Sequence, residues 1–240
     1  RDPDGVAAVR LLYRNQSAAA FSQAAMYDDG AHGDGGAGDG IWAGAVPPFA
    51  AGTRVEFAIE AEDARGAVAS FPDAEPCLYM VQNSWPRAAV AQCHLVMTDA
   101  TAQELASRFL MSNELLPASF VLNDDTIYHN VKFRPRGSPY IRPQQPSGYR
   151  VRFGNDDPFR GRIKALNLDP QMQDASKQRE RTVFHLARKI GVSRTDGRMP
   201  YSLDDYLTLW RNGARLALYE QVERVDGAYL SGWWPGDDDG

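Results

Sequence analysis

The stretch YHNVKFRPRGSPYIRPQQPSGYRVRF, residues 128–153, decides the fold of the second half of the chain. Its two arms alternate between apolar and cationic residues, which predicts two paired β-strands with one apolar and one cationic face. The apolar positions are Val131, Phe133, Pro135, Tyr149, Val151 and Phe153. The cationic positions are Lys132, Arg134, Arg136, Arg150 and Arg152. Because like charges opposed across a ladder are destabilising, the cationic face is either solvated or, as we expect, holds a phosphate-bearing ligand.

The charge of the chain is strongly uneven. The 240 residues carry a net charge of −5, with 43% hydrophobic and 24% charged residues, as in an ordinary globular protein of one or two domains. Residues 1–83 hold twelve Asp and Glu against five Lys and Arg, whereas residues 128–164 hold nine Lys and Arg against two Asp. A basic block inside an acidic chain indicates a local anionic partner rather than nucleic acid. No apolar run is long enough for a membrane span.

The first part of the chain has the pattern of short β-strands. Expected strands cover 6–14, 20–27, 53–63 and 77–82, with turn signals between them. We therefore expect an α+β chain that begins with an antiparallel β-sandwich of immunoglobulin or fibronectin type over residues 1–83. A linker is expected over 84–92, and a second domain over 93–240. Cys77 and Cys93 either form a disulfide or remain free thiols.

A loop rich in glycine and aspartate, MYDDGAHGDGGAGDGIW, interrupts this sheet at residues 26–42. Its Asp29, Asp34 and Asp39 recur every five residues and are weak candidates for Ca²⁺ ligands, since the spacing does not fit an EF-hand. We favour an exposed turn in which Asp side chains bond to local backbone groups. The segment resembles one in β-sandwich modules of large secreted bacterial proteins.

The second part mixes strands and helices. We expect a strand at 93–98, a helix at 101–110 with Thr101 and Glu104 in capping-box spacing, and a hairpin that leads into the basic stretch. A further helix is expected at 175–190, followed by two strands joined by a turn at Asn212-Gly213. The apolar stripe of this helix consists of Val183, Phe184, Ala187 and Ile190.

Glu180 borders the apolar stripe of the expected helix at 175–190 and needs a partner if it is buried. We expect Arg152 or Lys164 to pair with it, as a strand cation and a helix glutamate pair beside the phosphates in protein kinases. The alternative is a first-turn glutamate that interacts with the helix dipole. Arg142, in the connection between the basic arms, is expected to matter little for nucleotide binding or turnover, in contrast to Glu180.

Five segments together resemble one family. In order they are VKFRPRGSP, GYRVRF, DDPFRGRIKALNLDP, KQRERTVFHLARKIGV and LYEQVERVDGAYL. They are similar to the N-terminal part of the CotH kinase family, named for spore-coat protein H. The resemblance implies the β-rich N-terminal lobe of an atypical protein kinase over 93–240. It also implies ATP with Mg²⁺ or Mn²⁺ as cofactors, and phosphorylation of Ser or Thr in secreted or surface proteins of bacteria.

The resemblance also assigns residues. Glu180 takes the place of the helix glutamate, and residues 221–224 lie near the adenine. The expected nucleotide- and phosphate-binding residues are Arg134, Arg136, Ser138, Arg150, Arg152, Lys164, Glu180 and Glu223. Two positions depart from the family pattern: Arg152 stands where the family usually has Lys, and Arg136-Gly137-Ser138 lacks its Asn. An Arg keeps the charge but changes the reach and geometry of the contact.

The chain opens with RDPDGV and ends with WWPGDDDG, so we expect a piece of a longer protein with any leader upstream. The catalytic and metal-binding acids of the family are expected beyond residue 240, and this chain alone is not expected to catalyse. The alternative is a non-catalytic surface or secreted module that binds a protein or a glycan.

Overall fold

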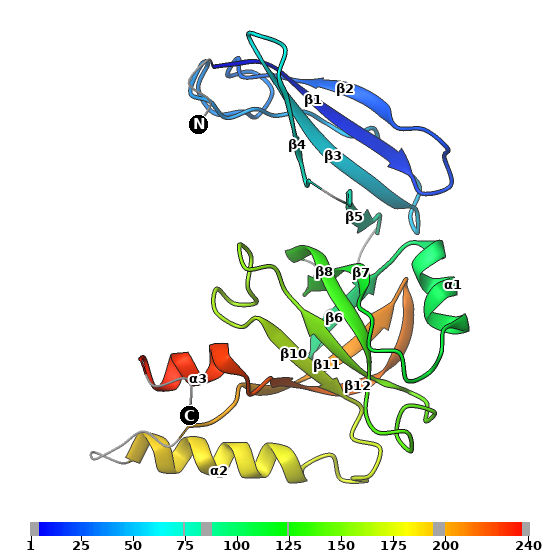
Figure 1. Ribbon diagram of the computed structural model, residues 1–240, viewed down its shortest axis with the longest axis vertical. Coiled ribbons are helices and arrows are strands. Elements are labelled where there is room, and N and C mark those ends of the chain that lie inside the picture. Colours follow the sequence, from blue (N-terminus) through cyan, green and yellow to red (C-terminus); the bar gives the residue numbers. More distant parts are fainter. Residues whose placement is uncertain (1–4, 74, 83–87, 124, 194–199, 237–240) are drawn as a thin grey trace. The chain divides into compact units, whose positions relative to one another are not determined.

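The computed structural model describes residues 5–73, 75–82, 88–123, 125–193 and 200–236. The chain divides into two units, Arg1–Trp85 and Pro86–Gly240, and each is described by itself (Figure 1). Among the described residues, no helix combines the length and the apolar character that a membrane crossing requires.

The first unit is a single antiparallel sheet. Its strands are β1 (Val6–Asn15), β2 (Ser22–Met26), β3 (Arg54–Asp63), β4 (Val68–Phe71) and β5 (Cys77–Met80). The order is β2-β1-β3-β4, and β5 also pairs with β3. The expectation of a sandwich of two facing sheets is therefore wrong for the described strands. The physical reason is that the long β3 pairs with β5 through its first half and with β4 through its second half, so both short strands join the same sheet.

The Gly- and Asp-rich loop has the local bonding expected of a turn. Asp34 is fully buried and accepts hydrogen bonds from the backbone N–H groups of Asp29, Gly30 and His32. The bond from Gly30 leads the causes that lower the pKa of Asp34. Asp39 likewise accepts from backbone groups of the same loop. In the part of the chain that the structure describes, no group of three or more His, Cys, Asp or Glu is arranged to hold a metal ion.

The second unit is a closed barrel of seven strands. They are β6 (Ala91–Val96), β7 (Leu116–Leu122), β8 (Thr126–Arg136), β9 (Gly148–Arg152), β10 (Ala165–Asp169), β11 (Asp204–Arg211) and β12 (Ala214–Glu223). The barrel closes in the order β10-β12-β11-β6-β7-β8-β9. β6 pairs with β11 in parallel, and the other pairs are antiparallel. Closure satisfies the strand edges that an open sheet would expose.

The basic stretch forms the β8–β9 pair, and its predicted strand parity is confirmed. Phe133 lies opposite Val151, and both are fully buried in the barrel core. Arg134 lies opposite Arg150, one position along the ladder, on the outer face. The alternation of side chains along a strand therefore fills the barrel with apolar groups and places the cations outside.

Three helices, α1 (Asp99–Ser107), α2 (Arg179–Ser193) and α3 (Gly227–Trp233), lie outside the barrel. The N-cap of α1 is Thr98, whose side chain accepts from the N–H of Thr101, so the expected capping role of Thr101 is wrong. The turn at Asn212-Gly213 forms as expected, with φ of 45° and 84°. Strand β4 and helix α3 were not foreseen.

Helix α2 buries its apolar stripe only in part: Phe184 and Ala187 are half-buried, and the other two residues are exposed. Val183 and Ile190 are 63% and 48% exposed, and Leu186 is also exposed. Polar contacts hold the helix to β11 instead: Arg181 lies 3.3 Å from a carboxylate oxygen of Asp205 and stacks over the ring of Tyr206 at 4.8 Å. The helix packs on the outside of a barrel whose facing residues are polar, and this explains why part of its apolar side remains exposed.

Both cysteines are free thiols. Cys77 is buried in the first unit, and Cys93 is buried in the second. Burial raises the pKa of the Cys93 thiol well above its ordinary value. Of the two states that the sequence allows, the structure has the reduced one.

Arg142 has a structural role that the sequence did not indicate. Its side chain is 4% exposed and sits in the connection between β8 and β9. The guanidinium donates to the carbonyls of Gly137, Leu110 and Ser112 and to Oδ1 of Asn113, at 2.8–3.3 Å. It therefore joins two loops that are distant in sequence, which the local pattern could not indicate.

We expect Arg142→Ala to lower the free energy of unfolding of the second unit by about 2–4 kcal/mol, because it removes a buried guanidinium that donates to four acceptors in two loops. Urea unfolding followed by fluorescence measures the change. Arg215→Ala is the matched control, since Arg215 is exposed on β12 and its loss should change stability by less than about 0.5 kcal/mol. Equal effects of the two variants would contradict the structural role.

Candidate functional site: a basic cleft

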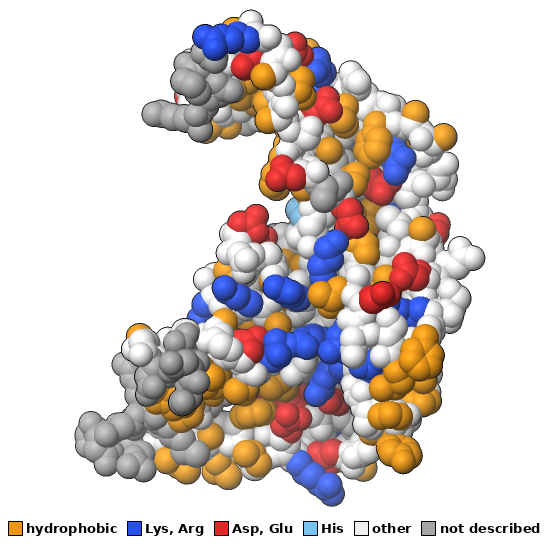
Figure 2. Space-filling model, viewed as in Figure 1, with side chains coloured by type: hydrophobic (Ala, Val, Ile, Leu, Met, Phe, Trp, Pro, Cys, Tyr) orange, Lys and Arg blue, Asp and Glu red, His pale blue; other side chains and the backbone are white. Residues whose placement is uncertain are grey.

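A cleft of about 750 Å³ opens on the outer face of the barrel. Five cations line it: Arg134, Arg150, Arg152, Lys164 and Arg224. Figure 2 shows Lys and Arg gathered in a band across this face of the second unit. We call this feature the basic cleft.

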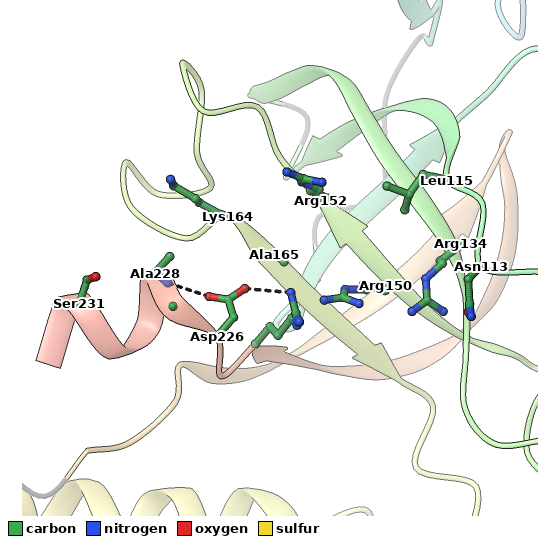
Figure 3. A pocket seen from close by; sticks show the side chains of 12 residues that line it. Asn113, Leu115, Arg134, Arg150, Arg152, Lys164, Ala165, Asp226, Ala228 and Ser231 are labelled. Atoms are coloured by element: carbon green, nitrogen blue, oxygen red, sulfur yellow. Dashed lines mark hydrogen bonds and ion pairs between the residues drawn. The ribbon is translucent and has the colours of Figure 1, made fainter. Parts of the chain in front are cut away.

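The strands of the barrel bring the cations together. Arg134 and Arg150 face each other across the β8–β9 ladder, and Arg152 follows two residues later on the same face. Lys164 directly precedes β10. Arg224 directly follows β12, and its backbone N–H bonds to the carbonyl of Ala165 at 3.1 Å. Figure 3 shows these strands side by side with the labelled cations projecting into the cleft.

The cations of the basic cleft repel one another. Partial burial lowers the pKa of Arg150, and the neighbouring Arg224 and Arg134 lower it further. The pKa of Arg134 is lowered in the same way, by burial and then by nearby arginines. Among the described residues, no carboxylate pairs with Arg150, Arg152 or Lys164. The arrangement is therefore costly without an anion and favourable with one.

Asp226 is the one acidic side chain among the described residues that line the basic cleft. Its Oδ2 accepts from Nη1 of Arg224 at 3.1 Å. Its Oδ1 accepts from the N–H groups of Ala228 and Tyr229, so the same carboxylate caps α3 (Figure 3). Asp226 thus joins the cleft to the helix that bounds it.

No protein-family model and no curated protein matches this chain.

The structure brings together four of the eight residues expected to bind a nucleotide or phosphate: Arg134, Arg150, Arg152 and Lys164. The other four lie elsewhere. Arg136 pairs with Asp169 at 2.6 Å and lines a second cavity of about 260 Å³. Ser138 is exposed in a turn of the β8–β9 connection. The expectation that these two residues join the cleft is not met.

Glu223 is also outside the basic cleft. It is buried, and its carboxylate accepts two hydrogen bonds from Arg162 and one from the backbone N–H of Leu203. Glu223 lies opposite Leu166, a core residue, in the β10–β12 ladder. Its side chain therefore follows the inward parity of the strand, and its oxygens are already occupied by groups of the protein.

Glu180 is paired with neither Arg152 nor Lys164 in the part of the chain described, so the expected ion pair is wrong. Its Oε2 instead accepts from Nε2 of Gln171 at 2.6 Å, beside the second cavity. The reason is position along β10: Lys164 precedes the strand, whereas the loop to Glu180 leaves its far end. Five residues of extended chain separate the two ends by ~17 Å.

Sequence reasoning covered Arg224 only as part of the segment 221–224, and it did not single out Asp226 or Asn113; all three also line the basic cleft. A signal existed for two of them. Arg224 continues the alternation of β12 beyond Val222, and Asp226 stands before Gly-Ala-Tyr as a helix N-cap would. Asn113 lies in a loop and carries no such pattern.

A cluster of acids surrounds the attachment of α2. Gln171 donates one hydrogen bond to Glu180 and another, also of 2.6 Å, to Glu220, which is 1% exposed. Burial raises the pKa of Glu220 from 4.5 to about 7, and the nearby Glu180, Asp204 and Asp169 add to the increase. This carboxyl therefore titrates near neutral pH.

We expect Glu220→Gln to stabilise the second unit at pH 8 by up to about 3 kcal/mol and to have little effect at pH 4. In the wild type, the folded protein holds a proton between pH 4.5 and about 7 that the unfolded chain releases, so stability falls as the pH rises through this range. Urea unfolding at several pH values measures the effect. Glu104→Gln, at an exposed position of α1, is the control and should leave the pH dependence unchanged.

Repulsion among the cations of the basic cleft should lower the stability of the second unit. Arg150→Gln should raise the free energy of unfolding by up to about 1 kcal/mol at low ionic strength, because it removes one of several like charges. The gain should shrink in ~0.5 M NaCl, which screens the repulsion. Arg215→Gln serves as the control. A loss of stability in Arg150→Gln at low salt would show that repulsion does not dominate at this position.

Proposed function

We propose that the basic cleft binds the phosphate chain of a nucleoside triphosphate, with ATP as the first ligand to test. The observation that carries this proposal is the convergence of five cations with a single carboxylate, which is itself paired. A triphosphate chain supplies several negative charges in a short length. Guanidinium groups bind phosphate oxygens through short, charge-assisted hydrogen bonds.

The layout of the cations supports an extended ligand. They project from or beside β8, β9, β10 and β12, and neighbouring strands lie ~4.8 Å apart. A chain of linked phosphates can therefore contact cations of successive strands in series. A single small anion would leave part of the cationic row without a partner.

The resemblance to CotH kinases extends the proposal to a longer parent protein. In that protein, the unit described would be the nucleotide-binding lobe of an atypical kinase that phosphorylates Ser or Thr in secreted or surface proteins. The pair between a strand cation and a helix glutamate is not part of the proposal, because Glu180 lies at the second cavity. What we propose for this chain is binding of the ligand.

Isothermal titration calorimetry with ATP tests the proposal. We expect Arg134→Gln and Arg152→Gln each to weaken binding by about 10- to 100-fold, the effect of losing one charge-assisted contact of roughly 1.5–3 kcal/mol. Arg215→Gln removes the same charge from the exposed part of β12 and should leave binding unchanged. Failure to bind ATP at millimolar concentration, or an equal loss in all three variants, would refute the proposal.

A further inference from the structure

We infer that the basic cleft binds its phosphate chain directly, without a bridging divalent cation, and that Asp226 competes with this ligand for Arg224. The inference rests on the proposed function and specifies the form of the ligand. It departs from the Mg²⁺- or Mn²⁺-bound nucleotide that the resemblance implies.

The carboxylate and amide oxygens that line the cleft already accept hydrogen bonds from groups of the protein. Mg²⁺ in phosphate sites is usually held by one or two carboxylates together with the phosphates. Here the carboxylate of Asp226 bonds to Arg224 through one oxygen and to the first turn of α3 through the other. The amide oxygen of Asn113 accepts from Nη2 of Arg142 at 2.8 Å. Apart from the hydroxyl of Ser231, these are the side-chain oxygens of the described residues that line the cleft.

The charge of the cleft favours the same conclusion. Arg134, Arg150 and Arg224 line the same cleft, and their mutual repulsion, after burial, lowers the pKa of Arg134 and Arg150. A divalent cation placed among them would add to that repulsion. The phosphate oxygens it would occupy are those that the guanidinium groups need. Direct contact gives the guanidinium N–H groups an acceptor and the phosphate oxygens a donor of opposite charge.

Asp226 opposes this contact at one point. Its pair with Arg224 is partly open to solvent, with side chains 20% and 40% exposed. For Arg224 to direct its fork at a phosphate, it must share or leave this carboxylate. Replacing Asp226 by Asn removes the competing charge and keeps a residue that is equally suited to an N-cap, so α3 should remain in place.

The test is calorimetric titration of the full chain with inorganic tripolyphosphate and, in a separate arm, with ATP. Each arm is run in EDTA and in ~10 mM Mg²⁺ at equal ionic strength. We expect binding in EDTA that Mg²⁺ weakens. Asp226→Asn should bind about two- to fivefold more tightly, as expected from removing a partly exposed ion pair.

Asp169→Asn is the matched control. It removes the same charge from an acid that pairs with Arg136 outside the basic cleft, and it should leave affinity unchanged. Asp226→Ser, another good N-cap, provides a second neutral variant if Asp226→Asn fails to fold. Tighter binding of ATP than of tripolyphosphate would show that the base contributes, and equal binding would show recognition of the phosphate chain alone; both support the inference.

Two results are unfavourable, and they can be told apart. Binding that requires Mg²⁺, or that is lost in the neutral Asp226 variants, would overturn the inference and leave the proposed function standing. Absence of binding to both ligands, with and without Mg²⁺, would overturn the proposed function itself.

Discussion

The register of β8 against β9 is the constraint on which the rest of the second unit depends. It places Phe133 opposite Val151 inside the barrel and, one position along, Arg134 opposite Arg150 outside. A shift of one strand by one residue would turn its apolar side chains outward and its arginines into the core. The register that fills the core is therefore the one in which the arginines face each other. The energy gained by burying the aromatic and aliphatic side chains thus holds like charges together.

The inward-facing side chains of β8 and β9 form the core, and the outward-facing side chains line the cleft. The closed barrel supplies the support, and an anion bound on its outer face would relieve the repulsion there and stabilise the folded state. The cleft is completed by segments just outside the strands: Lys164 before β10, and Arg224 with Asp226 after β12. Asp226 links the charge of the cleft to the start of α3, so binding at Arg224 and the position of that helix are physically connected.

The two ends of β10 have opposite character. Lys164, Arg152 and Arg224 lie at its start, whereas Asp169, Gln171, Glu180 and Glu220 gather at its end. The acidic end holds α2 through hydrogen bonds and the contacts of Arg181, and leaves Val183 and Ile190 of the apolar stripe exposed. The kinase-like pairing expected for Glu180 would require one helix residue to reach the other end of the strand. The structure instead gives Glu180 a neutral amide partner.

The sequence by itself determined most strands of the barrel, the two faces of the β8–β9 pair and four of the five cleft cations. These follow from local alternation, since neighbouring residues of a strand must point to opposite sides. Only the tertiary structure decided the closure of the barrel, the single sheet of the first unit, the burial of Arg142 and the partners of Glu180 and Glu223. Each of these depends on which distant segments meet, and a local pattern carries no information about the partner that a polar side chain finds across the fold.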